Sequence, residues 1–164
     1  MLFLMIFIFS FVESGENHFQ HYKEKADLYL SRKHFINTPI TGDMLFNSAK
    51  KVCDSTGILV PLELVLAQAQ LESGMGLKGK SPQKNPFNIG EYGSKTVIKF
   101  NSTKQGVEAY YFLMAEKYLK CSTINELLDN FVNCNNHRYA SSKDYEKKIK
   151  NQYYFIRRWL KSNF

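Results

Sequence analysis

The sequence is poor in cysteine and has no apolar run long enough to cross a membrane. Its three cysteines, Cys53, Cys121 and Cys134, allow at most one internal disulfide. The simplest interpretation is that they are buried small apolar side chains, with a Cys121–Cys134 bridge as the alternative. No CxxC or Cys/His spacing is present, so we expect no metal site and no cofactor. The longest apolar run, residues 2–12, falls short of the roughly 20 residues of a membrane-spanning helix.

That apolar run, LFLMIFIFSFV, is typical of the central region of a secretory signal peptide. Val12 and Ser14 are small residues before a predicted cleavage site after Ser14. Basic residues are missing in front of the run, so an uncleaved anchor is the alternative. We predict a signal peptide at 1–14, export to the periplasm, the cell envelope or the medium, and one domain at 15–164. No internal repeat or low-complexity linker marks a second domain.

The chain is also short of acidic residues relative to basic ones. It has 22 Lys and Arg against 15 Asp and Glu, a formal net charge of +7. A polyanion is therefore a natural neighbour, and nucleic acid, anionic lipid and anionic cell-wall polymer all qualify. Aromatics such as Tyr153 and Trp159 stand among C-terminal basic residues, as in some nucleic-acid-binding helices. Their helical spacing favours the core, and the export signal argues against nucleic acid, so we expect no nucleic-acid partner.

Apolar periodicity and helix-end signals predict a mainly α fold, a helical bundle with one small β-hairpin lobe. Residues 93–100 contain β-branched residues after a Gly-Ser turn and predict the hairpin. The expected helices are 17–33, a segment from Thr41 to Gly57, one from Pro61, and three that begin with capping boxes at Ser102, Thr123 and Ser141.

The helix from Pro61 ends in QLESGMG, with Glu72 directly before a glycine-containing stop. The C-terminal end of a helix carries partial negative charge, which disfavours an ionised carboxylate. Burial beside the apolar stripe of the helix acts in the same direction, so we expect a raised pKa, as a general acid requires. Gly74 and Gly76 would turn the backbone away and leave a groove. A surface glutamate before an ordinary glycine stop is the other interpretation. The predicted stripe comprises Leu64, Ala67 and Leu71.

Four segments resemble the glucosaminidase domain, glycoside hydrolase family 73. LAQAQLESGMG at 66–76 is similar to the family's AQAxLESGxG. KNPFNIGEYG at 84–93 is similar to NNxFxIK at Asn85, Phe87, Ile89 and, with a Pro86 substitution, at the asparagine pair. VIKFNSTKQGVEAYYFLM at 97–114 resembles FRxYxSxxxSxxxYxxLL. RYASSKDYEKKI at 138–149 resembles YAxDxxYxxKI, with serine for aspartate at position 142. The resemblance covers roughly 40–160, and its elements follow the family order.

This resemblance implies a lysozyme-like fold and an endo-β-N-acetylglucosaminidase that cleaves a β-1,4 bond of peptidoglycan glycan strands. Glu72 falls on the family's general acid and Tyr139 on an active-site tyrosine. Glu91 is the candidate second carboxylate, with a solvated turn residue or attack by the substrate's own acetamido group as alternatives. The expected substrate-binding residues are Gln68, Asn85, Phe87 and Asn88, although Phe87 and Tyr139 also suit the core.

Other activities remain compatible with the same residues. A lytic transglycosylase or a muramidase would act on the same glycan strands, and a non-catalytic wall-binding module would use the groove and the basic C-terminal residues. We expect a monomer whose partner is peptidoglycan, with no obligate protein partner.

Overall fold

The computed structural model describes residues 19, 21–79, 83–90 and 96–164, and helices dominate it. The predicted mainly α class is confirmed. None of the helices within these ranges is long and apolar enough to cross a membrane. The predicted signal peptide lies outside the described residues. The elements are an N-terminal helix at 21–30, η1 (Lys33–Phe35), α2 (Gly42–Thr56), α3 (Leu62–Ser73), α4 (Thr103–Leu113), the π-helix η2 (Met114–Leu119), α5 (Ile124–Asn130) and α6 (Tyr145–Asn163).

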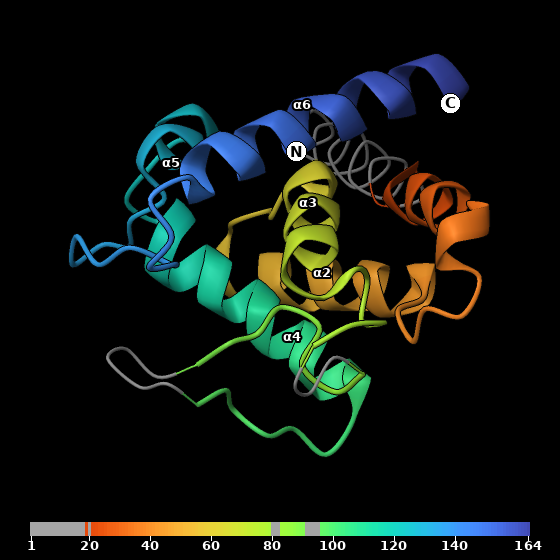
Figure 1. Cartoon of the computed structure of the whole chain (residues 1–164), viewed down its shortest axis with the longest axis horizontal. Helices are drawn as coiled ribbons and strands as arrows, with labels where there is room; N and C mark the ends of the chain where they lie inside the picture. The colour runs from red at the N-terminus through yellow and green to blue at the C-terminus, as the bar shows by residue number, and fades with distance from the viewer. Residues whose placement is uncertain (1–18, 20, 80–82, 91–95) are drawn as a thin grey trace, which may run out of the picture.

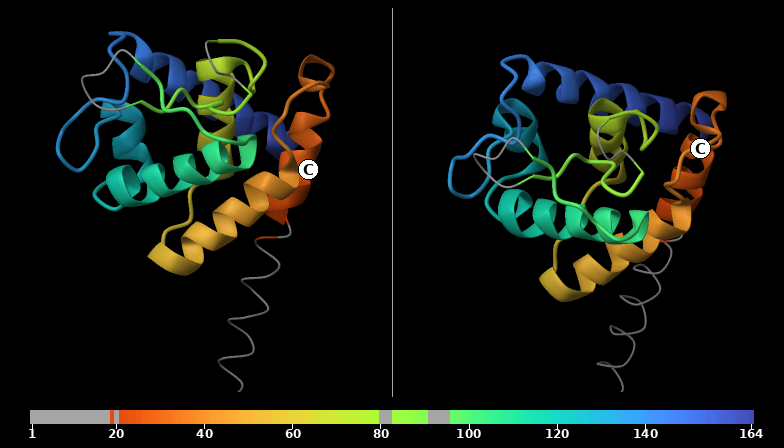
Figure 2. Two further views of the ribbon diagram at one scale, coloured as in Figure 1. Left: turned by 90° about the horizontal axis from the view of Figure 1, so that it is seen from below. Right: turned by 60° about the horizontal axis from the view of Figure 1, so that its bottom comes forward.

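Helix α3 is the central element of the fold. Figure 1 shows it between α6 and α4, and α2 lies alongside α4 in both views of Figure 2. Residues 64–69 of α3 are all buried, because a helix that is apolar on nearly every side needs neighbours all round. Leu71 is 37% exposed, so the prediction that it belongs to the core is wrong.

Side chains at helix starts follow the sequence signals in two of the three predicted capping boxes. The hydroxyl of Thr123 accepts from the backbone of the glutamate three residues later, whose carboxylate accepts from the Thr123 backbone, so this box is complete. Ser102 caps α4 by accepting from the N–H of Gln105. The box at Ser141 is wrong, because α6 begins only at Tyr145 and has no side-chain cap.

The segment between α3 and α4 has little regular β structure in its described part. Gly90 and Val97 form one antiparallel bridge, and the N–H of Ile98 donates to the carbonyl of Ile89 at 2.8 Å. The turn predicted between these residues, and Glu91 with it, lies outside the described residues. The hairpin lobe therefore stays a prediction.

A disulfide joins Cys121, just after η2, to Cys134 in the loop that follows α5. The bridge that the sequence left as an alternative is therefore present, and Cys53 remains a free, half-buried thiol. The loop at 133–137, which contains Cys134, is closed at its base by an antiparallel bridge between Val132 and Arg138. This arrangement positions the residue that follows, Tyr139.

Candidate active site

Glu72 lies in the last turn of α3, where the chain reverses through a left-handed turn. Gly74, Met75 and Gly76 have φ values of 56°, 63° and 78°, a region that favours glycine. The N–H of Gly74 donates to α3 carbonyls, as expected for a helix stop. Met75 tolerates this conformation because its side chain is fully buried and its carbonyl accepts from the Thr38 hydroxyl at 2.6 Å.

The carboxyl group of Glu72 is half-buried and accepts a hydrogen bond from Asn88. The side-chain amide of Asn88 donates to the Glu72 backbone carbonyl at 2.6 Å and to its Oε2 at 3.3 Å. The Tyr145 hydroxyl, from α6, is on the other side of the carboxyl group and acts to lower its pKa. Burial raises the pKa of Glu72, and Tyr145 and Asn88 partly oppose this rise. The group thus holds its proton to higher pH than an ordinary glutamate.

An aromatic cluster stands beside the acid. The ring of Tyr139 stacks on Tyr145 with centroids 5.8 Å apart and meets Phe131 edge-on at 5.6 Å. Its hydroxyl donates to the carbonyl of Phe87 at 2.7 Å. Burial raises the pKa of Tyr139, and the charge of nearby Glu72 adds to this rise. The structure therefore brings the two predicted catalytic residues Glu72 and Tyr139 together.

Three of the predicted substrate-binding side chains are fully buried beneath the acid. Gln68 contacts Tyr145 and Tyr110 through its amide. The side chain of Asn85 bonds the N–H and carbonyl of Ile89 and the carbonyl of Ile98, in each case at 2.9 Å. Phe87 stacks on Tyr110 with centroids 3.7 Å apart. Of the four, Asn88 is the one that reaches Glu72.

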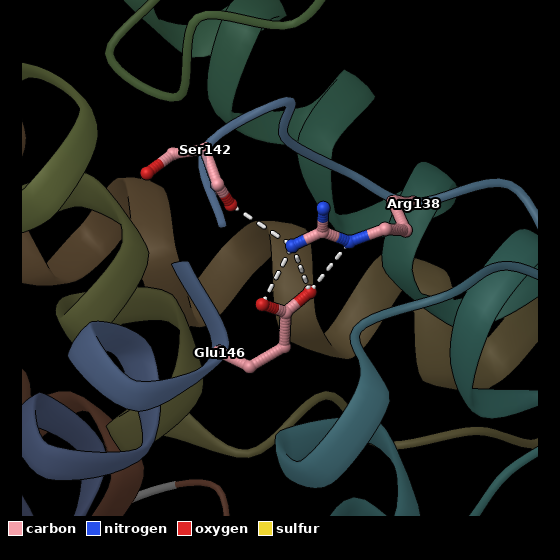
Figure 3. A network of polar contacts seen from close by, with 3 residues as sticks. All are labelled: Arg138, Ser142 and Glu146. Carbon is pink, nitrogen blue, oxygen red and sulfur yellow. Dashed lines mark hydrogen bonds and ion pairs between the residues drawn. The ribbon is translucent and has the colours of Figure 1, made fainter. Parts of the chain in front are cut away.

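The loop with Tyr139 is fixed to the start of α6 by the ion pair in Figure 3. The guanidinium of Arg138 donates to both carboxylate oxygens of Glu146, at 2.6 and 2.7 Å, and to the carbonyl of Ser142 at 2.9 Å. This forked contact sets the spacing between Tyr139 and Tyr145. Ser142, which stands where the resemblance expects an aspartate, takes part through its backbone.

Sequence reasoning missed the roles of Tyr110 and Tyr145. Tyr145 is buried at the start of α6, and the sequence analysis assigned its hydroxyl no function. The available signal was the motif itself, because Tyr145 occupies the second tyrosine of YAxDxxYxxKI. Tyr110 likewise occupies the tyrosine of the preceding segment.

Two other features of the described residues are separate from this site. A cavity of about 330 Å³ lies at the opposite end of α3 from Glu72. Its lining residues are His21, Tyr22, Lys25, Leu59, Pro61, Leu62 and Glu63. In the described part of the chain, no group of three or more His, Cys, Asp or Glu residues is placed to hold a metal ion.

Comparison with protein families agrees with this geometry. The family model described as mannosyl-glycoprotein endo-beta-N-acetylglucosaminidase matches residues 46–156. This range contains Glu72, its hydrogen-bond partners and Tyr139. Comparison with individual curated proteins finds no match. Because the matched range is more than half of the chain, the protein belongs to the glucosaminidase family of glycoside hydrolases.

Proposed function

We propose that the protein is an endo-β-N-acetylglucosaminidase that cleaves peptidoglycan glycan strands, with Glu72 as the general acid. Family membership supports a glycoside hydrolase of the cell wall. The observation that carries the assignment is the position of Glu72: half-buried, hydrogen-bonded by Asn88 beside the Tyr139–Tyr145 cluster, and with a pKa that burial raises. A carboxylic acid that keeps its proton near neutral pH is what a glycosidic leaving group needs.

In this proposal the proton of Glu72 passes to the glycosidic oxygen as the bond from that oxygen to the anomeric carbon breaks. The electron pair of the bond stays on the oxygen, and positive charge develops on the sugar ring. Asn88 holds the carboxyl group in place. The Tyr139 hydroxyl donates its proton to the Phe87 carbonyl, which leaves its oxygen able to accept a hydrogen bond from the reacting sugar or water.

Water then supplies the hydroxyl of the anomeric carbon and gives up its other proton. That proton passes to Glu91 if Glu91 is the base, or to the Glu72 carboxylate if a nucleophile has attacked the sugar first. Glu91 is our candidate for the base or nucleophile of this step, and it lies outside the described residues. The acetamido oxygen of the substrate is the alternative, and it needs no second carboxylate. Gln68, Asn85 and Phe87 support the site from beneath. The groove that would hold the glycan strand stays a prediction, as does export of the chain through the segment at 1–14.

The decisive experiment replaces Glu72 with glutamine, which keeps the shape and removes the transferable proton. Release of fragments from purified peptidoglycan should fall at least 10²-fold. Glu63→Gln is the matched control, because it removes a carboxylate from the first turn of the same helix and should leave the rate near wild type. An active Glu72→Gln enzyme would rule out the assignment.

Mass spectrometry of the released fragments identifies the bond. A reducing N-acetylglucosamine end supports the proposed activity. A reducing N-acetylmuramic acid end would instead make the enzyme a muramidase, and an anhydro-muramyl end a lytic transglycosylase. Binding of wild-type protein to peptidoglycan without any cleavage would make it a wall-binding module.

A further inference from the structure

The net charge of the chain is concentrated in its last helix. The segment 147–164, which includes most of α6, contains six Lys and Arg and no Asp or Glu. The rest of the chain contains 16 basic and 15 acidic residues. Almost all of the formal charge of +7 therefore belongs to this one segment. A charge that serves solubility alone needs no such concentration.

The packing of α6 leaves these cations on its outer side. Its buried side chains, at helical spacing, are Tyr145, Ile149, Tyr153, Ile156 and Leu160. Five of the six cations are exposed: Lys147, Lys148, Arg157, Arg158 and Lys161. We call these five residues the basic face of α6. Figure 1 shows α6 along the outer edge of the molecule, and it packs on α3 with its other side.

The basic face also lacks counter-charges in the described part of the protein. Other exposed cations have carboxylate partners: Lys50 pairs with Asp54 at 3.2 Å, for example. The sixth cation of the segment, Lys150, pairs with Asp129 of α5. None of the five residues of the basic face forms an ion pair with a described carboxylate. These positive charges are therefore available to a partner.

The five cations form two clusters along the helix. Lys147 and Lys148 lie in the first turn of α6, and Arg157, Arg158 and Lys161 lie in its last turns. A rise of about 1.5 Å per residue puts the two clusters about 15 Å apart. A small anion reaches only one cluster. A chain of anions reaches both, and its second contact then forms at a high effective concentration.

We propose that the basic face of α6 binds a flexible polymer of the cell wall that carries repeated phosphate groups. Family membership supports an enzyme of the cell wall, and the charge and length of the face fit such a chain. The guanidinium groups of Arg157 and Arg158 suit phosphate, because each can donate two parallel hydrogen bonds to its oxygens. The surface holds the enzyme at the wall, and it does not depend on the role of Glu72.

A lipid bilayer is a poorer partner for this helix. Helices that lie in a membrane surface insert their apolar face among the lipids. The apolar face of α6 is already buried in the core, so a bilayer could contact this helix only through its charges. A flexible chain can instead follow the helix from one cluster to the other.

The first test measures binding of long-chain inorganic polyphosphate to the full chain at several salt concentrations. The variant Lys147→Glu/Arg158→Glu/Lys161→Glu should bind at least about 10-fold more weakly than wild type. Its plot of log affinity against log salt should be shallower by about 2, because each neutralised phosphate of a single strand contributes about 0.7 to the slope.

The matched control is Lys104→Glu/Lys117→Glu/Lys120→Glu, which changes the net charge by the same amount at exposed positions outside α6. This control should bind polyphosphate nearly as well as wild type. Equal weakening of the two triple variants would overturn the proposal, because total charge would then explain the binding.

Other probes test the chemistry of the partner. Pyrophosphate should compete poorly with polyphosphate, since it cannot reach both clusters, and effective competition would contradict the two-cluster surface. Equally tight binding of poly-L-glutamate would overturn the assignment to phosphate. If the basic face binds vesicles of phosphatidylcholine and phosphatidylglycerol more tightly than polyphosphate, the partner is a membrane and the proposal is wrong. Tighter binding of duplex DNA would overturn it in favour of nucleic acid.

Two further variants keep these tests decisive. Glu72→Gln should bind polyphosphate as wild type does, so failure of the general acid and failure of this surface appear in different assays. Thermal melts check that each triple variant folds. If the glutamate variant of α6 does not fold, Lys147→Gln/Arg158→Gln/Lys161→Gln takes its place, because it adds no negative charge. Wild-type affinity in that variant would overturn the proposal.

Discussion

Removal of the Cys121–Cys134 disulfide should cost the protein about 3 kcal/mol of unfolding free energy. The two cysteines are 13 residues apart in the sequence, and closing a loop of that length in the unfolded chain carries roughly this entropy. Small domains are commonly stable by about 5–15 kcal/mol, so the loss would be a large share of the total.

The folded state should change little, because backbone contacts hold the loop without the disulfide. The N–H of Cys134 donates to the carbonyl of Lys117 at 2.7 Å, and that of Tyr139 to Phe131 at 3.0 Å. Both bridged cysteines are exposed, so serine in their place leaves no buried cavity. Activity of the folded double variant at low temperature should therefore stay near wild type, which separates the disulfide's effect on stability from the geometry around Tyr139.

The assay is urea unfolding of the oxidised protein, the reduced protein and the double variant Cys121→Ser/Cys134→Ser. The last two should unfold at similar urea concentrations, well below that of the oxidised protein, and reductant should leave the double variant unchanged. Cys53→Ser is the control, and its curve should respond to reductant as wild type does. If reduction leaves the wild-type curve in place, or costs less than about 1 kcal/mol, the loop-entropy reasoning is refuted.

Two further predictions concern the acid and the packing below it. Burial raises the pKa of Glu72 in the folded protein above its unfolded value of about 4.3. The free energy of unfolding of wild type should therefore be unaffected by this group below that pH and should fall as the pH rises towards the folded pKa, because ionisation costs more in the folded state. Glu72→Gln should become more stable relative to wild type over that pH range. A difference between the urea midpoints of the two proteins that stays the same at every pH would contradict this. Gly106→Ala should cost about 1–3 kcal/mol, since its new Cβ would lie 2.1 Å from the Lys84 carbonyl. Lys104→Ala, at an exposed position of the same helix, should stay within about 0.5 kcal/mol of wild type in the same melts.

Features set by neighbours in the sequence could be predicted well. The capping box at Thr123 and the left-handed stop at Gly74 depend on a few adjacent residues, and both are present. The position of Glu72 at a helix end followed from the same signals. Leu71 shows the limit of this reasoning, because periodicity along one helix does not say where its neighbours end. The π-helix at 114–119 gave no sequence signal, since its helical pattern continues that of α4.

The surroundings of the acid could not be derived from spacing alone. Gln68 and Tyr145 are 77 residues apart, and Gln68 and Tyr110 are 42 apart. Their contact depends on how α3, α4 and α6 cross, which no local pattern encodes. The family resemblance indicated the residues of the site, but not which of them contact one another.

The packing of α3 against α6 also sets the order in which the enzyme becomes competent. A ribosome delivers Glu72 and Gln68 well before Tyr145, and any passage of an unfolded chain through a membrane keeps the same order. Until residues 145–163 arrive, α3 lacks one of the neighbours that an almost wholly apolar helix requires. Glu72 would then be more solvated, without the full burial that raises its pKa. A chain caught partway through synthesis or translocation should therefore carry the acid without the ability to use it, so that cutting begins only after the chain has closed on itself.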